Sequence, residues 1–559
     1  MGVLQIIVVM VLLILIVKPL GTYIYHIFSN ESNRTDRVFG PIEKVIYKII
    51  GLKNHSAMTW KKYALSLIIV NIVLVAIGYC ILRWQSGLPL NPNGITNMEP
   101  TLTFNTIVSF MTNTNLQHYS GETGLSYLAQ IAVIIMMMFA SAATGIVVAI
   151  AFIRGITSKG KTLGNFFEDF VKAHVRLLLP IALVATLVLV ALHVPQTLSP
   201  TIQATTIDGH TQQIAIGPVA SLESIKHLGT NGGGFFGVNS AHPFENPNPL
   251  TNVLEILLMW SIPAALTYTF GRFAKNQKQG WIIFGAMMIL FTCFLSLAYY
   301  AESQPNPAIS SLGMDVSQGS MEGKEVRFGI PQSALFTTVT TAATTGSVNN
   351  MHDTLTPLGS IVPLGLMMLN SVFGGDGVGL VNMLMYAMLT VFIAGLMVGR
   401  TPEFLGRKIE PREMKLIAIA ILVHPFIILA PTAIALVTDL GTSAISNPGY
   451  HGITQVLYEY TSSAANNGSG FAGLGNNTPF WNITTGIVML LGRYISIIAL
   501  LAVAGSLVKK QWVPETIGTF RTDNRMFMGL LIAIVLVIGA LTFLPVIVLG
   551  PVAEWLTLR

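Results

Sequence analysis

Long runs of apolar residues alternate with shorter polar connections along the whole chain. A helix needs about 20 apolar residues to cross the hydrocarbon core of a bilayer. Nine runs of about this length lie at residues 3–28, 62–82, 126–153, 172–194, 252–271, 281–300, 414–437, 482–505 and 526–550. Each predicts a transmembrane helix. The first run has neither a basic leader nor an A-x-A cleavage pattern, so we expect it to be retained as a span.

A tenth apolar region, residues 355–399, is too long for one straight helix and is interrupted at SVFGGDGVG, Ser371 to Gly379. The basic residues decide how it crosses. The connections at 29–62, 154–176, 272–280, 400–415 and 506–525 carry 24 of the 31 lysines and arginines, whereas those at 83–125, 195–251, 301–354 and 438–481 carry four. Basic connections stay in the cytoplasm. Residues 355–399 therefore cross an odd number of times, and one broken crossing is simplest.

The count becomes ten spans with both termini outside, which predicts a multi-pass membrane protein. Composition agrees, because only 10% of the residues are charged and the mean hydropathy is +0.65, whereas soluble domains carry about 25% charged residues. The net charge of +6 reflects this topology rather than an anionic partner. Cys80 and Cys293 lie in apolar runs and indicate neither a disulfide framework nor a metal site.

Each of the four long outer connections contains one tetrad of small polar residues. The tetrads recur at spacings of 118, 114 and 122 residues, which indicates an old internal duplication. They are Thr112, Asn113, Thr114 and Asn115; Thr230, Asn231, Gly232 and Gly233; Thr344, Thr345, Gly346 and Ser347; and Asn466, Asn467, Gly468 and Ser469.

A moderately apolar segment of 11 to 14 residues precedes each tetrad. Three segments begin with a proline, Pro100, Pro218 or Pro331, and proline is favoured at the first helical position. A helix of 11 residues is only about 16 Å long, half the thickness of the hydrocarbon core. We expect it to enter from outside, stop at mid-depth and return as an extended strand.

The fold class expected is therefore an all-α polytopic membrane protein with four fused repeats of span, short pore helix, filter strand and span. The expected divisions are a first span at 1–28, repeats at 60–154, 170–272, 280–400 and 414–506, and a last span with the C-terminus at 526–559. The second span of the third repeat is the broken one.

This arrangement favours a cation. The C-terminus of a helix carries about half a negative charge, and four such ends would converge on one axis. Four extended strands would offer layers of carbonyl oxygens that replace the hydration shell of an ion, and glycine allows the unusual backbone angles required. Ordinary external turns would use the same residue types, but four aligned copies on one face favour a filter.

The sequences around the tetrads resemble those of one family. GTNGGGFFGVNSAHPFENPNPLTN, TAATTGSVNNMHDTLTPLG, SAANNGSGFAGL and AGLMVGRTPEFLGRKIEPREMK are similar to the potassium-binding subunit of the bacterial Kdp-type potassium-transporting ATPases, and the resemblance covers essentially the whole chain. It implies a fold shared with the superfamily of four-unit potassium transporters. It also implies that external potassium, the only expected ion, binds at the tetrads and passes through an intramembrane tunnel.

The resemblance further implies three partners: a separate catalytic P-type ATPase subunit and two smaller accessory subunits, all in membrane lipid. This chain would be a non-catalytic subunit without a nucleic-acid partner. A self-sufficient secondary potassium transporter or channel of the same superfamily is the alternative, since it would need the same filter. Potassium flux through the isolated chain would distinguish the two.

Five residues are candidates for gating. Arg493 lies midway along the ninth apolar run, where arginine is costly and faces protein or water. The superfamily has a basic residue at the corresponding position of its fourth unit, so the resemblance implies a positively charged gate below the filter. The alternative is that Arg493 is a buried hydrogen-bond partner for helix carbonyls. The resemblance implies an intramembrane gating loop at Gly374, Gly375, Asp376 and Gly377. A simple helix kink is the alternative there.

GITSKGKT, Gly155 to Thr162, fits the phosphate-binding P-loop pattern. That motif needs a strand before it and a helix after it in an α/β domain, and a connection of about 20 residues cannot hold one. The P-type phosphorylation motif D-K-T-G is also missing from the sequence. We therefore expect no nucleotide to bind to this chain and no ATP hydrolysis by it alone.

Other polar residues of the outer connections have simpler interpretations. Glu223 and Lys226 are expected to form a local pair on the second short helix. The histidines show no ligand spacing, so zinc is not expected. They are His118, His227, His242, His352 and His451.

Overall fold

The computed structural model describes residues 2–29, 31, 35–52, 55–158, 160, 162–315, 317–514 and 519–558. Within them, ten helical segments are long and apolar enough to cross a membrane. They are α1 (Gly2–Phe28), α3 with η1 (Trp60–Gly87), α6 with η2 and α7 (Tyr127–Thr157), α8 with η3 and α9 (Phe166–Ala191), α11 (Pro249–Phe273), α12 (Gln277–Glu302), α16 (Val378–Met397), α17 (Pro411–Leu436), α20 (Pro479–Leu507) and α21 with η6 and α22 (Arg525–Thr557). The predicted ten spans are confirmed.

The tenth apolar region is a broken crossing, as predicted. Helix α15 (Pro357–Leu369) ends at Asn370, whose φ of 44° places it in the left-handed region. Helix α16 starts after Gly377, whose φ is 88°. Backbone in this region is natural for glycine and uncommon for other residues. The residues between the two helices therefore turn away from the helical path inside the bundle.

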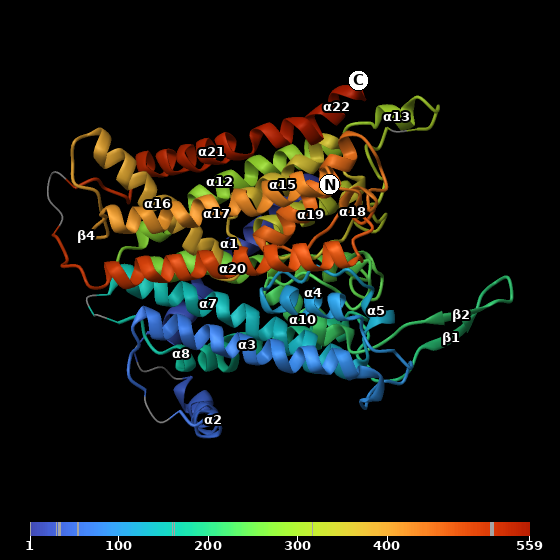
Figure 1. Ribbon diagram of the computed structural model, residues 1–559, viewed down its shortest axis with the longest axis horizontal. Helices are drawn as coiled ribbons and strands as arrows, with labels where there is room; N and C mark the ends of the chain where they lie inside the picture. Colours follow the sequence, from blue (N-terminus) through green and yellow to red (C-terminus); the bar gives the residue numbers. More distant parts are fainter. Residues whose placement is uncertain are drawn as a thin grey trace.

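Four short helices precede the tetrads and lie at one end of the bundle, which we call the tetrad end (Figure 1). They are α4 (Pro100–Met111), α10 (Val219–Leu228), α14 (Gly329–Ala342) and α19 (Tyr450–Ala465). With 10 to 16 residues, they are about 15–24 Å long, too short to cross. The all-α fold with four units of span, short helix, tetrad and span is thus present.

The starts of these helices differ in part from the proline pattern. Pro100 is the first residue of α4, as expected, and the carboxylate of Glu99 caps that helix by accepting from the amide of Leu102. Pro218 instead precedes α10 as its cap residue, and α14 begins two residues before Pro331. Proline is compatible with any of the first positions, because the first N–H groups of a helix have no intrahelical partner.

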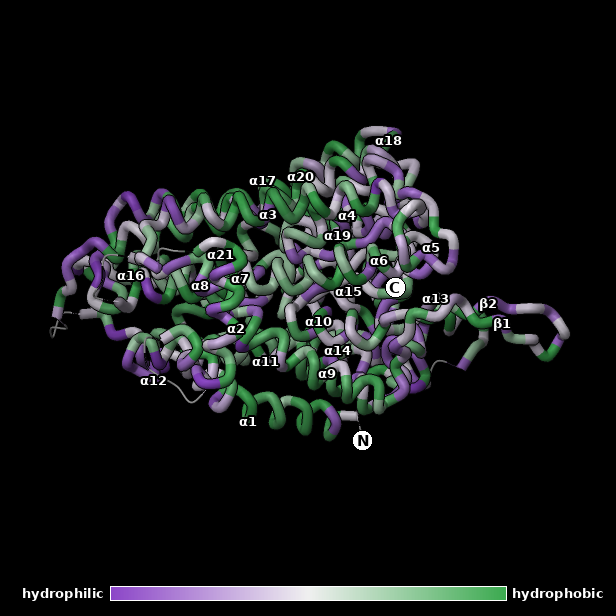
Figure 2. Tube along the Cα trace, turned by 90° about the horizontal axis from the view of Figure 1, so that it is seen from below, coloured by the Kyte–Doolittle hydropathy of each residue, from purple (hydrophilic) through white to green (hydrophobic). Residues whose placement is uncertain are grey.

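Hydrophobic residues follow the helices, and hydrophilic residues gather toward the ends of the bundle (Figure 2). Both ends of the chain lie toward the tetrad end (Figure 1), as an even number of crossings requires. A hairpin of β1 (Ile202–Thr205) and β2 (Thr211–Ile214) projects from the same end. The second hairpin, β3 (Glu403–Phe404) with β4 (Arg407–Lys408), lies at the opposite end. Which end faces outside stays a prediction.

The remaining helices of the described chain are short and lie in the connections. They are α2 (Asp36–Ile49), α5 (Gly121–Gly124), η4 (Asn239–Ala241), α13 (Pro307–Ser310), η5 (His352–Thr354) and α18 (Asp439–Thr442).

Candidate functional site

All sixteen tetrad residues are buried. Each tetrad begins at or just beyond the last turn of its short helix, so the C-terminal ends of α4, α10, α14 and α19 meet the tetrads. These ends carry the negative side of the helix dipole. The local field around the tetrads therefore favours a cation over an anion.

Backbone oxygens of the first, third and fourth tetrads converge on Gly232 of the second tetrad. A Cβ atom placed on Gly232 would lie 3.0 Å from the carbonyl oxygen of Thr114, 3.0 Å from that of Thr345 and 3.2 Å from that of Asn467. One point is therefore surrounded by a main-chain oxygen from each of the other three units. Layers of carbonyl oxygens at such short range are the way in which potassium filters replace water around the ion.

Two other glycines approach neighbouring strands equally closely. A Cβ on Gly346 would collide with the carbonyl oxygen of Asn467, and one on Gly468 would collide with that of Thr114. Both glycines have positive φ, 92° and 107° respectively, so a side chain is excluded by space and by backbone angle. Glycine at the third position of the third and fourth tetrads is thus required for close strand packing, whereas the first tetrad has Thr114 there.

Several non-glycine tetrad residues also adopt left-handed backbone angles. Thr230 has φ 47°, Thr344 φ 44°, Asn466 φ 54° and Asn113 φ 64°. For a β-branched residue this region is a genuine outlier, and such strain costs on the order of 1–3 kcal/mol when the surroundings enforce it. The hydrogen bonds around the tetrads supply that enforcement.

A closed ring of hydrogen bonds joins the four units in order. Asn113 Nδ2 donates to the carbonyl oxygen of Thr230 (2.8 Å), Ser347 Oγ lies 2.9 Å from His227 Nε2, Asn467 Nδ2 donates to the carbonyl oxygen of Thr340 (3.0 Å), and Asn466 Nδ2 donates to Thr114 Oγ1 (2.9 Å). The first bond joins units one and two, the second units two and three, the third units three and four, and the last closes the ring. Asn113 and Asn466 therefore link one tetrad to another, and Asn467 links its tetrad to helix α14.

A buried charge cluster supports the second tetrad from behind. Lys226 Nζ lies 2.7 Å from Glu223 Oε2, which confirms the predicted pair, and 2.8 Å from Glu245 Oε2. All three side chains are fully buried. Glu245 also accepts from the amide of Phe236 (2.8 Å), just beyond the tetrad. The cluster therefore fixes the chain on both sides of the strand.

Glu255 adds a further carboxylate to this region. One atom each of Glu223, His227 and Glu255 lie within 4.8 Å of one another, a grouping that the sequence spacing did not reveal. His227 Nδ1 lies 2.9 Å from the carbonyl oxygen of Glu223, which assigns the proton to Nδ1 and leaves Nε2 to accept from Ser347. Because Glu223 already pairs with Lys226 and both nitrogens of His227 have protein partners, we interpret the group as structural.

The other candidate histidines have separate partners. His118 lies between Asn482 (2.7 Å) and Glu459 (3.0 Å). His352 Nδ1 is 2.7 Å from the hydroxyl of Tyr458, which in turn is 2.8 Å from Ser469 of the fourth tetrad. His242 stacks on Phe236 with centroids 3.6 Å apart, and His451 bridges Asp353 and Glu554. Of the five, His227 contacts a tetrad residue directly and His352 contacts one through Tyr458.

The candidate gating loop lies against the first residues of two tetrads. The amide of Asp376 donates to Thr230 Oγ1 (2.9 Å), and a Cβ on Gly375 would lie 2.8 Å from Thr344 Oγ1. The carboxylate of Asp376 is buried, and neither oxygen has a hydrogen-bond partner among the described residues. The loop therefore packs against the side of the bundle axis at which these two tetrads begin.

Arg493 lies beside this loop. Its Nη2 donates to the carbonyl oxygen of Ser141 on α7 (3.1 Å), and only 5% of the residue is exposed. A Cβ placed on Gly145 would contact both the main-chain oxygen of Asp376 and Nη2 of Arg493. The structure thus brings the loop and the arginine together around one turn of α7 (Met136–Thr157).

A cavity of about 50 Å³ extends from the first residues of two tetrads toward one flank of the bundle. Thr344 and Asn466, the first residues of two tetrads, lie at one part of its lining, together with Arg493. His424 of α17 and Thr542 of α21 line another part. Polar groups therefore continue from the tetrads into the space between the spans.

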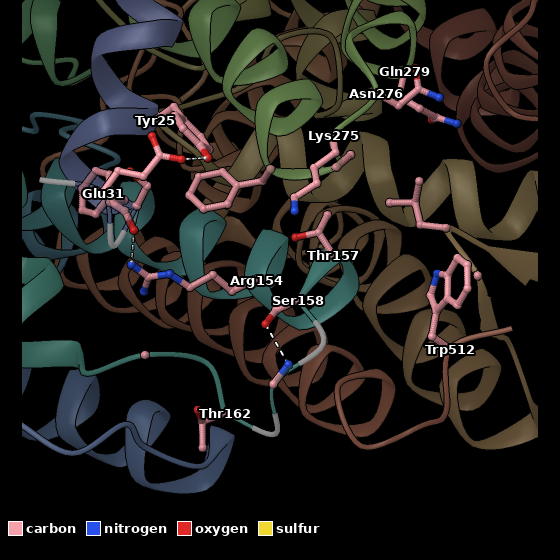
Figure 3. A pocket seen from close by; sticks show the side chains of 18 of the residues that line it. Tyr25, Glu31, Arg154, Thr157, Ser158, Thr162, Lys275, Asn276, Gln279 and Trp512 are labelled. Carbon is pink, nitrogen blue, oxygen red and sulfur yellow. Dashed lines mark hydrogen bonds between the residues drawn. The ribbon is translucent and has the colours of Figure 1, made fainter. Parts of the chain in front are cut away.

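The P-loop-like stretch lies at the opposite end of the bundle. Helix α7 continues to Thr157, so a helix and not a strand precedes the loop; Lys159 and Lys161 lie outside the described residues. Ser158 Oγ accepts from the amide of Gly160 (3.0 Å). Thr157, Ser158 and Thr162 line a large cavity of about 1120 Å³ between the ends of the spans (Figure 3). The absence of nucleotide binding at this loop stays a prediction.

Comparison with known proteins identifies the family. The family model of the potassium-transporting ATPase A subunit matches residues 7–556. The chain belongs to this family. The potassium-transporting ATPase potassium-binding subunit of Geobacillus kaustophilus (strain HTA426) is 66% identical over 548 residues, 98% of each chain. The crystal structure of the potassium transporter TrkH from Vibrio parahaemolyticus matches 81% of this chain and 85% of that chain, with 15% identity and a TM-score of 0.49.

The resemblance seen in the sequence is therefore confirmed for this member of the A-subunit family. Sequence reasoning missed three residues that support its tetrads, namely Glu245, Glu255 and Gln117. Gln117 donates to the carbonyl oxygen of Gly234 (3.0 Å) and accepts from its amide (2.8 Å). The position of Gln117, two residues after the first tetrad, is the one signal that was present in the sequence.

Proposed function

We propose that this A-subunit family member binds extracellular potassium at a selectivity filter formed by its four tetrads. The observation that carries the proposal is the point at Gly232 where carbonyl oxygens of Thr114, Thr345 and Asn467 lie within 3.2 Å. Four helix C-termini next to the tetrads carry partial negative charge, which also favours a bound cation. The sixteen tetrad residues are the ligating and supporting set.

The ion then moves inward past the loop of Gly374, Gly375, Asp376 and Gly377 and past Arg493. Arg493 acts as a positive barrier that holds potassium in the filter until the loop moves. The cavity beneath the tetrads is the start of an intramembrane tunnel. It leads to a separate catalytic P-type ATPase subunit, so this chain is a non-catalytic subunit that binds no nucleotide.

The assembly proposed has two smaller accessory subunits as well and lies in a bacterial inner membrane with both termini of this chain outside. Membership of the A-subunit family and the name of the Geobacillus relative support a potassium-binding role within a complex. The repeats proposed within the chain are 60–154, 170–272, 280–400 and 414–506, flanked by spans at 1–28 and 526–559.

The test is potassium binding to the complete complex by isothermal titration calorimetry without nucleotide. The methyl group of Gly232→Ala would stand among three carbonyl oxygens. We expect potassium affinity to fall at least about tenfold, which is about 1.4 kcal/mol, with a loss of preference over sodium. Gly529→Ala is the matched control, because a Cβ at Gly529 on α21 meets nothing within 4 Å.

Equal affinities for Gly232→Ala and Gly529→Ala would reject the filter. A second measurement separates the alternative function. If the chain alone, in vesicles without an ATPase subunit, sustains potassium flux, it is a self-sufficient transporter or channel. Binding without sustained flux supports the subunit function.

A further inference from the structure

Helix α2 (Asp36–Ile49) lies away from the tetrads and takes no part in the filter proposed above. It connects α1 to α3 at the end of the bundle opposite the tetrads and lies outside the spans (Figure 1). In Figure 1 the spans run across the view whereas α2 is seen nearly end-on, so its axis crosses the direction of the spans. A helix in this position lies parallel to the membrane surface.

Three kinds of residue occupy three separate faces of α2. The docked face carries Asp36 and Glu43, which bind Arg176 of the protein. The apolar stripe is Val38, Ile42, Val45 and Ile49, which are 64%, 47%, 58% and 77% exposed. The basic stripe is Arg37, Lys44 and Lys48, all exposed. At about 100° per residue, each set gathers on one side of the helix, and the stripes lie on either side of the docked face.

The docking contact fixes the depth of α2 in the membrane. Arg176 Nη2 donates to Glu43 Oε2 (2.7 Å), its Nε donates to the other oxygen, and Glu43 is buried. A bidentate pair of this kind also fixes orientation. Arg176 lies in η3 (Ala173–Leu178), inside the fourth span. The helix is therefore attached to a span and not to a cytoplasmic domain.

The lipid-facing surface of the same span begins next to this contact. Leu179 and Leu183 of α9 (Leu179–Ala191) are 53% and 59% exposed, and Leu179 follows Arg176 by only three residues, about 4.5 Å along a helix. The apolar stripe of α2 is thus exposed at the level where acyl chains begin. An apolar patch at this level meets lipid rather than water.

We propose that α2 is an interfacial helix that inserts its apolar stripe among the acyl chains and binds anionic phospholipid headgroups with its basic stripe. Short connections on both sides, 29–35 and 50–59, keep it near the membrane. The separation of an apolar stripe from lysine and arginine is the pattern of helices that lie in the plane of an anionic interface. Through Arg176 the helix ties this surface to the inner half of the second unit.

Spin-label depth measurements on the full chain in its complex would test this inference. Cys80→Ser and Cys293→Ser remove both native cysteines, and a nitroxide is attached at Ile42→Cys, Val45→Cys or, as a matched control on the basic stripe, Lys44→Cys. The complex is placed in vesicles of equal parts phosphatidylcholine and phosphatidylglycerol. All three side chains are exposed, so labelling does not disturb packing.

We expect labels at 42 and 45 to lie about 5–10 Å below the phosphates, accessible to oxygen, and the label at 44 to be accessible to a water-soluble nickel chelate. Equal nickel access at all three positions would place α2 in water and overturn the proposal. Access of neither reagent at 42 and 45 would mean that a protein covers the stripe, which also overturns it.

The charge requirement has its own measurement. With the label at Ile42→Cys, we expect a shallower position in vesicles of phosphatidylcholine alone, and the same shift when Lys44→Gln and Lys48→Gln are introduced in the mixed vesicles. An unchanged depth in both conditions would overturn the assignment of anionic headgroups to the basic stripe.

Discussion

The amide of Asp376 donates a 2.9 Å hydrogen bond to the hydroxyl of Thr230. This bond joins the loop of the broken crossing to the first residue of the second tetrad, two segments about 146 residues apart in sequence. Thr230 itself has a left-handed φ of 47°. The loop therefore holds a residue of the second tetrad that has a strained backbone angle, and a movement of the loop away from Thr230 would break this bond.

Thr230→Val removes the acceptor and keeps the shape of the side chain. The amide of Asp376 is then left buried without a partner, which costs about 1–3 kcal/mol. We expect a lower apparent unfolding temperature and a weaker hold on potassium. Thr230→Ser keeps the hydroxyl and loses the branch that strains this backbone angle, so it should be at least as stable as the native chain. If valine and serine behave alike in thermal unfolding and potassium binding, the bond has no role.

Arg493→Gln removes the positive charge beneath the tetrads. Two like charges 4 Å apart repel by about 4 kcal/mol at an effective dielectric constant of ~20. We expect passive potassium leak through the reconstituted complex, without ATP, to rise at least about tenfold, equivalent to about 1.4 kcal/mol. Arg493→Lys keeps the charge, and we expect its passive potassium leak to stay at the native level. A native leak in Arg493→Gln would show that Arg493 serves only to bind the carbonyl of Ser141.

Lys226→Met leaves Glu223 and Glu245 buried without their shared cation. Breaking a buried ion pair in this way costs about 3–5 kcal/mol. We expect the variant to unfold at a much lower temperature or to fail to assemble. Lys278→Met is the control, because Lys278 is exposed at the start of α12 and such changes usually stay within about ±0.5 kcal/mol. Similar stability of the two variants would refute the supporting role of the cluster.

His451 makes stability depend on pH at the tetrad end. Burial lowers its pKa, but hydrogen bonds to Asp353 (3.0 Å) and Glu554 (2.9 Å) outweigh this and raise the pKa to about 9. Because the pKa is raised on folding, the stabilisation is complete below the unfolded value of about 6.5 and is lost as pH rises through about 9. We expect the native chain to be more stable than His451→Gln at pH 6, with the difference disappearing above pH 9.

The measurement is the apparent unfolding temperature across this pH range. His210→Gln, at the exposed turn between β1 and β2, is the control and should not change the profile. A native profile parallel to that of His451→Gln would contradict the prediction. Because Glu554 belongs to α22 (Ala553–Thr557), the last helix should also loosen above pH 9.

Features that depend on local sequence alone were predictable. The spans follow from apolar length, the broken crossing from SVFGGDGVG and the parity of basic connections, and the tetrads from their recurrence. The bonds that hold the tetrads were not predictable in the same way. Glu245 reaches Lys226 from 19 residues further along the same connection, Glu255 reaches His227 from the following span α11, and no periodicity relates them. Helix starts also differed at Pro218 and Pro331, because proline fits several first positions.

Among the described residues, a break like that between α15 and α16 occurs in one of the four units. A channel made of four identical chains must repeat every feature four times and can open only along its symmetry axis. Fusion of the units in one chain removes that restriction. One unit here carries an aspartate-bearing loop and a neighbouring unit an arginine, and the cavity below extends between α15, α16, α17, α20 and α21 on one flank. For the potassium path proposed above, this asymmetry favours one flank of the bundle, whereas four identical chains would offer four equivalent flanks.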